Sequence, residues 1–326
     1  MLPPRPGSLW LLAACMGACA YAESASETNP NIKTIPLRTH SLASPYLDSD
    51  MQSRWFDFGG DTIIRADQYI RLTSDRQGQE GWIFSRVPLT ATNWEIEVEF
   101  KIHGTGNLHA DGMAMWLTKQ RAIPGPVFGS TDRFEGLGIF FDTYKNARPG
   151  TIFPYVMAMV GDGQTTYDKA HDGKENELAG CSARGLRGAS IPTKFRLTYI
   201  QDKSLKLELQ YRTQDEWTLC FDIEGVKIPT VAYLGFSAET GELSDNHDII
   251  SVESRNLYNS QQFSESRSKG GKSARKQKGK GYDPNRDPRS AGWGWFLIKI
   301  VLCLVVVGGA YVGYTVYRTS KRSSRF

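Results

Sequence analysis

Hydrophobic and polar residues alternate in short segments over residues 41–258, and turn residues separate these segments. In residues 94–102 every second side chain is apolar, with glutamate or lysine between. Residues 195–199 and 205–211 repeat this alternation on either side of a polar turn. A period of two residues with one polar face is typical of antiparallel strands that cover a core. No long amphipathic helical pattern interrupts the region, so we expect a single all-β antiparallel sandwich.

The N-terminus carries the pattern of a secretory signal. The positive residue Arg5 precedes an apolar run over residues 9–19. Ala20 and Ala22 then follow in the small-x-small pattern of a cleavage site. We therefore expect residues 1–22 to be removed and the sandwich to face the lumen.

A second apolar run near the C-terminus predicts a transmembrane helix over residues 293–317. Residues 295–317 would extend roughly 35 Å as a helix, against a hydrocarbon core of about 30 Å. Lys299 stands close to the start of the run, where its long side chain can reach the headgroups. The cleaved signal and this single span predict a type I membrane protein whose residues 318–326 form a cytosolic tail.

Charge is unevenly distributed between the sandwich and the segment that follows it. Residues 23–260 carry a net charge of −8. Residues 261–292 are instead rich in Ser, Gly, Lys and Arg, with few aliphatic side chains, and we interpret them as a disordered basic stalk. The acidic main domain argues against nucleic acid as a partner and is compatible with a cation site.

The cysteines indicate one disulfide. Cys15 and Cys19 leave with the signal, and Cys303 lies in the expected membrane span. Cys181 and Cys220 remain as one possible pair in an oxidising compartment, so we expect a disulfide between them. The chain contains no Asn-x-Ser/Thr sequon, and we therefore expect it to carry no N-linked glycan itself.

One loop combines residue types that hold hard cations. A long apolar run ends abruptly at Asp142, and Tyr144 and Asn146 follow at intervals of two residues. Calcium takes about six to eight oxygen ligands, which carboxylates, amides and backbone carbonyls supply from loops. Asp142 and Asn146 would offer side chains and Tyr144 its carbonyl, with Asp168 and Asp172 in a second loop. Spacing alone does not distinguish this site from ordinary loop carboxylates.

Five longer motifs resemble the leguminous-type lectins of the early secretory pathway of animals and fungi. They are the residue runs DGMAMW (111–116), PGPVFG (124–129), FDTYKN (141–146), ELAGC (177–181) and LSDNHDIIS (243–251). They occur in the family's order, and the resemblance covers residues 35–260. The group it resembles most is the vesicular integral-membrane mannose-binding lectins. The resemblance implies a concanavalin-like sandwich (jelly roll) in a luminal domain that binds high-mannose N-glycans with the help of Ca2+.

The resemblance also implies roles for individual residues. The implied carbohydrate-binding residues are Asp111, Asn146, Lys169, Gly241, Glu242 and Leu243. The implied calcium ligands are Asp142, Tyr144, Asn146 and Asp172, with Asp168 as a further candidate. In such a site calcium fixes the loop and the asparagine amide, so that sugar recognition needs the ion without direct contact between metal and sugar. The pair Cys181 and Cys220 matches the family's disulfide.

Three positions depart from the family's pattern. Lys169 stands where the family commonly has a sugar-contacting histidine, and His171 follows two residues later. Because lysine donates hydrogen bonds but does not accept them, and keeps its charge near pH 6, we expect a weaker pH dependence of binding. Trp82 replaces a small polar residue and would block one glycan arm or stack on it. Glu242 replaces a usual aspartate.

Two features of the sequence favour functions other than that of a working lectin. Glu95, Glu97 and Glu99 share one strand face and loosely resemble the catalytic strand of sandwich-fold glucanases, in which two carboxylates act as nucleophile and acid. We expect an ordinary solvent face there and no enzyme. The second alternative, which Lys169 and Trp82 favour, is a family member that has lost sugar binding and acts as a protein-binding receptor or a partner of other lectins.

Topology and resemblance together imply a cellular role. Lectins of this group carry or retain glycoproteins between the endoplasmic reticulum and the Golgi, so we expect a cargo receptor in the ER, the ER–Golgi intermediate compartment or the Golgi. The tail ends in the aromatic residue Phe326 and lacks a dilysine retrieval signal. A terminal aromatic residue resembles export signals that vesicle coat components recognise.

Overall fold

The computed structural model describes residues 32–259 and, near the C-terminus, Gly308, Gly309, Tyr311, Gly313 and Tyr314. The expected signal peptide (1–22), stalk (261–292) and cytosolic tail (318–326) lie outside the described residues. The five described residues of the expected membrane span are helical. In the described part of the chain, no helix has the length and hydropathy of a membrane span.

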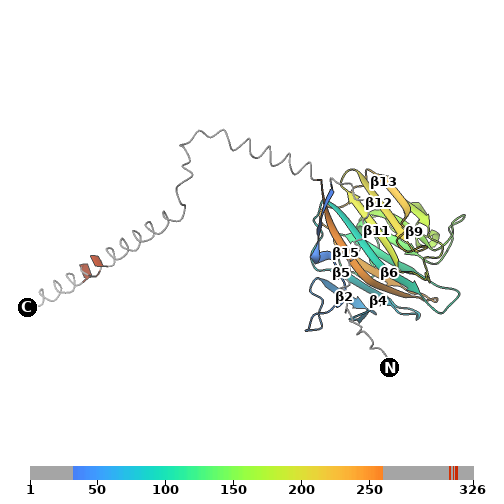
Figure 1. Ribbon diagram of the computed structural model, residues 1–326, viewed down its shortest axis with the longest axis horizontal. Coiled ribbons are helices and arrows are strands. Elements are labelled where there is room, and N and C mark those ends of the chain that lie inside the picture. The colour runs from blue at the N-terminus through green and yellow to red at the C-terminus, as the bar shows by residue number, and fades with distance from the viewer. Residues whose placement is uncertain (1–31, 260–307, 310, 312, 315–326) are drawn as a thin grey trace, which may run out of the picture. The chain divides into compact units, whose positions relative to one another are not determined.

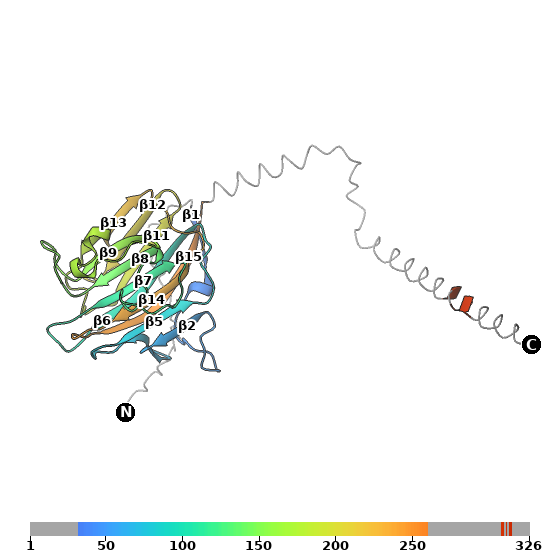
Figure 2. The ribbon, with the colours of Figure 1, turned by 180° about the vertical axis from the view of Figure 1, so that it is seen from behind.

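Two antiparallel sheets pack face to face, one with eight strands and one with seven; Figure 1 and Figure 2 show them from opposite sides. The strands of the eight-stranded sheet are β1 (Ile32–Pro36), β3 (Ile63–Arg65), β4 (Tyr69–Thr73), β6 (Asn93–His103), β11 (Thr193–Ile200), β12 (Ser204–Gln210), β13 (Thr218–Glu224) and β15 (Asn246–Asn259). Their order is β13-β12-β11-β6-β15-β4-β3, and β1 pairs with β15.

The seven-stranded sheet has the order β10-β9-β8-β7-β14-β5-β2. Its strands are β2 (Phe56–Gly60), β5 (Glu80–Ser85), β7 (Gly112–Thr118), β8 (Glu135–Asp142), β9 (Tyr155–Asp162), β10 (Ala179–Ser182) and β14 (Tyr233–Glu239). Single-turn 3₁₀ helices lie in the connections, at η1 (Arg38–His40), η2 (Lys169–His171) and η3 (Lys174–Asn176). The predicted all-β antiparallel sandwich is confirmed.

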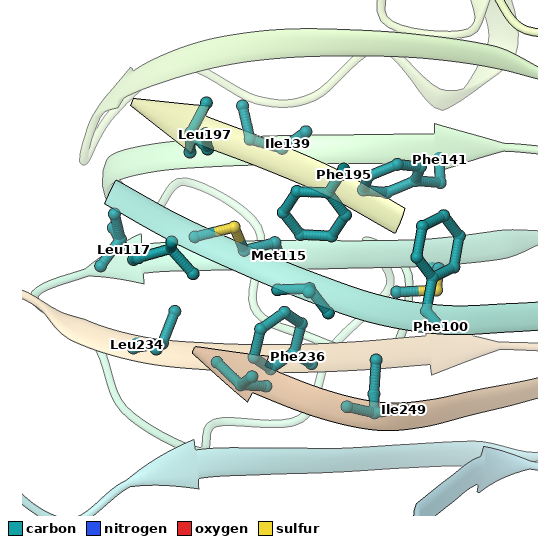
Figure 3. Close-up of a cluster of buried hydrophobic side chains, with 14 of the residues drawn as sticks. Phe100, Met115, Leu117, Ile139, Phe141, Phe195, Leu197, Leu234, Phe236 and Ile249 are labelled. Atoms are coloured by element: carbon teal, nitrogen blue, oxygen red, sulfur yellow. The ribbon is translucent and has the colours of Figure 1, made fainter. Parts of the chain in front are cut away.

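The main core fills the space between the sheets (Figure 3). Phe100 of β6 and Phe195 of β11 face the other sheet, and the rings of both lie 5.0 Å from the ring of Phe141 on β8, measured between centroids. The alternating strands of the sequence supply this core with every second side chain. Along β6, for example, the apolar positions are buried and the polar positions between them are more accessible.

A second apolar cluster covers the outer face of the seven-stranded sheet. Phe140 of β8 stacks on Phe128, which belongs to the loop between β7 and β8. Tyr167, from the loop between β9 and β10, lies with its ring 4.9 Å from that of Phe140. Because loops cover this face, β7 is buried at every position and β8 at every position after Glu135. These strands therefore read as continuous apolar runs.

The disulfide between Cys181 and Cys220 is present, as predicted. Cys181 lies in β10, at the edge of the seven-stranded sheet, and Cys220 lies in β13, at the edge of the eight-stranded sheet. The bond therefore ties the two sheets together along one side of the sandwich.

Strand β15 runs along the length of the sandwich. Its first residue, Asn246, pairs with His103 at the end of β6, close to where β7 begins. Its last residue, Asn259, pairs with Ile32 of β1 at the opposite end. The two ends of the described domain thus lie side by side, at the end of the sandwich away from the start of β7.

Candidate cation and ligand site

A polar pocket lies at the outer face of the seven-stranded sheet, where β8 ends. Glu239 on β14 and Asp142 on β8 both pair with Gly112 of β7, which places no side chain between the two carboxylates. Both face outward, because Asp142 stands two residues after Phe140 of the outer cluster and Glu239 two residues after Ser237, which bonds Phe128. The pocket is lined by Asp111, Pro126, Val127, Phe128, Asp142, Tyr144, Asn146, Tyr167, Lys169 and Glu239.

Asp142 and Asp172 form a buried pair of carboxylates beside this pocket. Asp172 is 1% exposed and Asp142 is 6% exposed. Burial raises the pKa of the Asp142 carboxyl well above its usual range, and the negative charge of Asp172 raises it further. Two like charges removed from water destabilise each other unless a cation lies between or beside them. The pair is therefore suited to a bound cation.

Asn146 connects this pair to the pocket. Its backbone N–H donates to the Asp172 carboxylate at 3.0 Å, and its side-chain amide donates to the same group at 2.7 Å. The backbone N–H of Tyr144 donates to Asp142 Oδ1 at 3.0 Å, so the loop after β8 folds back on its own first carboxylate. The amide oxygen of Asn146 and the carbonyl of Tyr144 are further hard oxygens of the kind that calcium binds.

Arg148 is the buried cation nearest to the pair, but its charge is already engaged. Its guanidinium forms an ion pair with Glu177 and lies 4.1 Å from the ring centroid of Tyr155. The Tyr155 hydroxyl in turn donates to Glu177 at 2.6 Å. Arg148 also donates to the backbone carbonyl of Asp172 at 3.2 Å. It therefore fixes the position of the second loop more than it neutralises the carboxylates.

Tyr167 adds an independent indication of a ligand. Its side chain is 4% exposed and lines the pocket, yet its hydroxyl has no hydrogen-bond partner in the described residues. Burial raises the pKa of this hydroxyl, and the charges of Asp142 and Asp172 raise it further. A buried polar group without a partner is costly, so a ligand or bound water at this place would relieve it.

The residues present fit a calcium ion, although the part of the chain that the structure describes contains no group of three or more His, Cys, Asp or Glu placed to hold a metal ion by themselves. The fit depends on the mixed donor set: two buried carboxylates, one amide oxygen and one backbone carbonyl. Asp168, the further candidate ligand, contacts a neighbouring side chain. Its carboxylate accepts a hydrogen bond from His171 at 2.7 Å, and neither residue lines the pocket.

Asp111 brings a third carboxylate to the pocket wall. Burial raises the pKa of its carboxyl, Lys169 lowers it and Glu239 raises it. Gly241 passes close by: a side-chain carbon at this position would lie 3.4 Å from Asp111 Oδ2. A side chain at this position would therefore be in van der Waals contact with the carboxylate.

The loop formed by Gly241, Glu242 and Leu243 is hydrogen-bonded to the turn that precedes β5. Its first carbonyl accepts a hydrogen bond from the backbone of Gly78 at 3.1 Å, and the Glu242 carbonyl accepts one from the side chain of Gln77 at 2.7 Å. These carbonyls are directed to the turn that precedes β5. The residues of this loop are not among those that line the pocket, but Gly241 borders Asp111.

Trp82 lies on the same outer face but outside the pocket. It pairs with Ser237 of β14 on one side and with Gly59 of β2 on the other. Its indole leans over Gly59, where a side-chain carbon would come within 2.3 Å of the ring. The tryptophan therefore leans toward the sheet edge, away from Glu239.

The three glutamates of β6 lie on the opposite face of the sandwich from the pocket. Glu95 pairs with Arg255 at 3.1 Å, and Glu97 pairs with Arg196 at 3.0 Å. Glu99 stands 3.9 Å from Lys194. They form part of a ladder of ion pairs.

Sequence reasoning missed Glu239, Arg148 and Tyr167. Glu239 lies two residues before Gly241, at the end of an apolar strand, and the strand period would have placed it on the face of the site. No local signal in the sequence distinguishes Arg148 or the Tyr167 hydroxyl, because their positions depend on the packing of two loops.

Comparison with known proteins agrees with this architecture. The model of the legume-like lectin family matches residues 33–264. The vesicular integral-membrane protein VIP36 of Mus musculus is 40% identical over 304 residues, which cover 89% of this chain and 84% of VIP36. An L-type lectin-like domain-containing protein of Schizosaccharomyces pombe is 43% identical over 227 residues, 69% of this chain and 72% of that protein.

A solved structure is similar at the level of the whole domain. The crystal structure of the VIP36 exoplasmic/lumenal domain, in a form bound to Ca2+ and Man2, matches with a TM-score of 0.64 and 44% sequence identity. The match covers 68% of this chain and 89% of the VIP36 chain. The expected family is thereby confirmed, and this protein belongs to the legume-like lectin family.

Proposed function

We propose that this protein is a mannose-binding lectin of the secretory pathway that recognises high-mannose N-glycans of glycoproteins with the help of Ca2+. The observation that carries the proposal is the buried pair of Asp142 and Asp172 beside Asn146, at the edge of a pocket that also contains Asp111. The VIP36 domain, which is bound to Ca2+ and to mannose in its crystal structures, supports the same assignment.

In this proposal, Asp142, Asp172, the Asn146 amide oxygen and the Tyr144 carbonyl hold the calcium ion. The bound ion supplies the positive charge that two buried carboxylates require, and it fixes the two loops relative to each other. Asp168 contacts His171 instead and is at most an indirect contributor.

Sugar recognition would then use groups that calcium holds in place. Asp111 accepts hydrogen bonds from mannose hydroxyls, and Asn146 uses its side chain next to the ion. Gly241, Glu242 and Leu243 contribute backbone amides above the sugar, and the carbonyls of Gly241 and Glu242 bond the turn below. Vicinal hydroxyls suit this arrangement of acceptors and donors.

The cellular part of the proposal rests on topology and on relatives. We infer a type I membrane protein with a luminal lectin domain, which transports glycoproteins or controls their quality between the ER and the Golgi. Its tail, ending in Phe326, would contact vesicle coat components. Removal of Phe326 should then slow exit from the ER in a pulse-chase experiment, and unchanged kinetics would eliminate this signal.

The proposal is tested by glycan-array binding of the full-length protein in detergent, with calcium and with EDTA. We expect binding confined to high-mannose structures, present with calcium and lost with EDTA. No binding by a folded, disulfide-bonded protein in either condition would favour the alternative, a protein-binding receptor. Lys169, whose ammonium contacts Glu239 at 3.0 Å, is the observation that favours this alternative.

We propose no catalytic reaction. The glutamates of β6 lie in ion pairs on the face opposite to the pocket, and the family and fold are those of carbohydrate-binding proteins.

A further inference from the structure

The Lys169 ammonium contacts acceptors of the protein itself. Its ammonium lies 3.0 Å and 3.1 Å from the two carboxylate oxygens of Glu239 and 3.4 Å from the carbonyl oxygen of Pro126. A lysine ammonium has three protons and no lone pair. The ammonium is thus directed to Glu239 and Pro126, while the Lys169 side chain as a whole is 49% exposed.

The contact joins three separate parts of the site. Lys169 belongs to η2, three residues before the buried Asp172. Glu239 ends β14, two residues before Gly241 of the loop above the sugar position. Pro126 belongs to the loop that also carries Phe128 of the outer cluster. The ion pair thus links the part of the site that would hold calcium to the part that would hold the sugar.

The electrostatics favour this link. The side chain of Glu239 is 15% exposed. In the register of the sheet, Glu239 lies opposite Glu80 of the neighbouring strand β5, which is a second negative residue. Asp111 and Asp142 bring two more carboxylates to the pocket. Among the described residues that line it, Lys169 is the only cation. A partly buried carboxylate in such surroundings needs a positive partner, so Glu239 and Lys169 hold each other in place.

We propose that Lys169 and Glu239 form a latch that couples the calcium loop to the sugar loop, with both acting as positioning residues. Lys169 acts through Glu239 instead of through a direct bond to the sugar. The inference rests on the proposed calcium-dependent glycan binding. It predicts that disrupting the latch weakens both calcium and glycan binding, although neither residue touches the ion.

The test is a double-mutant cycle on the full-length protein in detergent. It compares K169M, E239Q, their combination and the charge swap K169E/E239K. The calcium dissociation constant comes from calorimetry, and affinity for a high-mannose oligosaccharide is measured with saturating calcium. We expect each single variant to lower both affinities about threefold to tenfold. The double variant should bind no more weakly than the single variant with the lower affinity, and the swap should recover part of the loss.

The ion pair of Lys119 and Glu135, at the other end of β7 and β8, is the matched control, and K119M and E135Q should change neither affinity.

A third readout needs no ligand. Hydrogen exchange of residues 168–172 in calcium-free protein should accelerate in both single variants and slow again in the swap. If the losses of affinity in the two single variants add up in the double variant, the latch is overturned. A K169M variant that loses glycan affinity while its calcium affinity and hydrogen exchange stay unchanged would overturn it as well. Wild-type protein that binds neither calcium nor glycan would overturn the proposed function instead, and the exchange data alone would then decide whether the latch exists.

Discussion

The outer face of the eight-stranded sheet carries a ladder of charges, whereas that of the seven-stranded sheet carries an aromatic cluster under loops. On the first face Glu97 accepts hydrogen bonds from Arg196 and Lys194 of the neighbouring strand. On the second, Phe140 lies beneath Phe128 and Tyr167 from two loops. Both sheets bury their inner faces in one core. The comparison teaches that the covered outer face is what makes a binding site possible, because loops anchored on it hold polar groups in a fixed arrangement.

The largest expected effect is the loss of the second cluster. Phe140→Ala removes a fully buried ring that contacts both covering loops, and such a change costs about 3–5 kcal/mol in the free energy of unfolding. Chemical denaturation of the purified protein measures it. A cost below about 1 kcal/mol would mean that the loops do not depend on the cluster, and the contrast between the faces would lose its basis.

The next effect concerns the carboxylates that the loops hold. Asp172→Asn removes one of the two buried charges and should lower calcium affinity by at least about 100-fold, so that calcium no longer raises the melting temperature. The matched control is Asp168→Asn in the same loop, which should keep the calcium response because that carboxylate pairs with His171. Equal losses in both variants would show that the cation lies elsewhere in the loop.

A third test concerns a titratable group between the sheets instead of on either outer face. Burial lowers the pKa of His247 to about 3, while the unfolded chain has an ordinary histidine. Below about pH 6.5 the unfolded state therefore binds a proton that the folded state does not, and stability falls as the pH falls. The loss between pH 6.5 and pH 5 is about 2 kcal/mol for this one group.

Urea denaturation at several pH values measures this dependence. His247→Asn should flatten this dependence. His40, whose pKa burial also lowers, contributes in the same direction and accounts for a remainder. An unchanged slope in His247→Asn would mean that His247 is protonated in the folded protein.

The smallest effects belong to the charged face. Glu97→Gln should change the free energy of unfolding by at most about 1 kcal/mol, because ion pairs near a protein surface contribute little. Glu95→Gln combined with Glu99→Gln should leave glycan affinity unchanged, as measured on the same glycan array. A loss of glycan binding, or glucan hydrolysis that disappears in this double variant, would place the functional site on the outer face of the eight-stranded sheet instead.

The strands of the charged face could be predicted from the sequence, because a solvent-facing strand alternates. The expected segments correspond to β6, β11 and β12, with a turn between the last two at residues 201–203. The strands under the loops were harder to assign, because both of their faces are buried and the period of two disappears from β7 and β8.

The same limit applies to the site. Asp142, Tyr144 and Asn146 could be singled out because they are near neighbours in one loop, and the structure brings Asp111 and Lys169 to the same pocket. The ion pair between Lys169 and Glu239 could not, since 70 residues separate the partners and only the sheet order brings them together. The orientation of the Trp82 indole likewise depends on another strand, because the ring occupies the space that a side chain at Gly59 would fill.

The length of β15 also fixes how the domain presents its pocket. The strand begins at Asn246, near the site, and ends at Asn259, beside the first strand. Fourteen residues of extended chain span about 45 Å. Residues beyond 259 therefore continue from a point that is one full strand length away from the pocket. The pocket and the C-terminal end of the described domain are thus separated by the whole length of one strand.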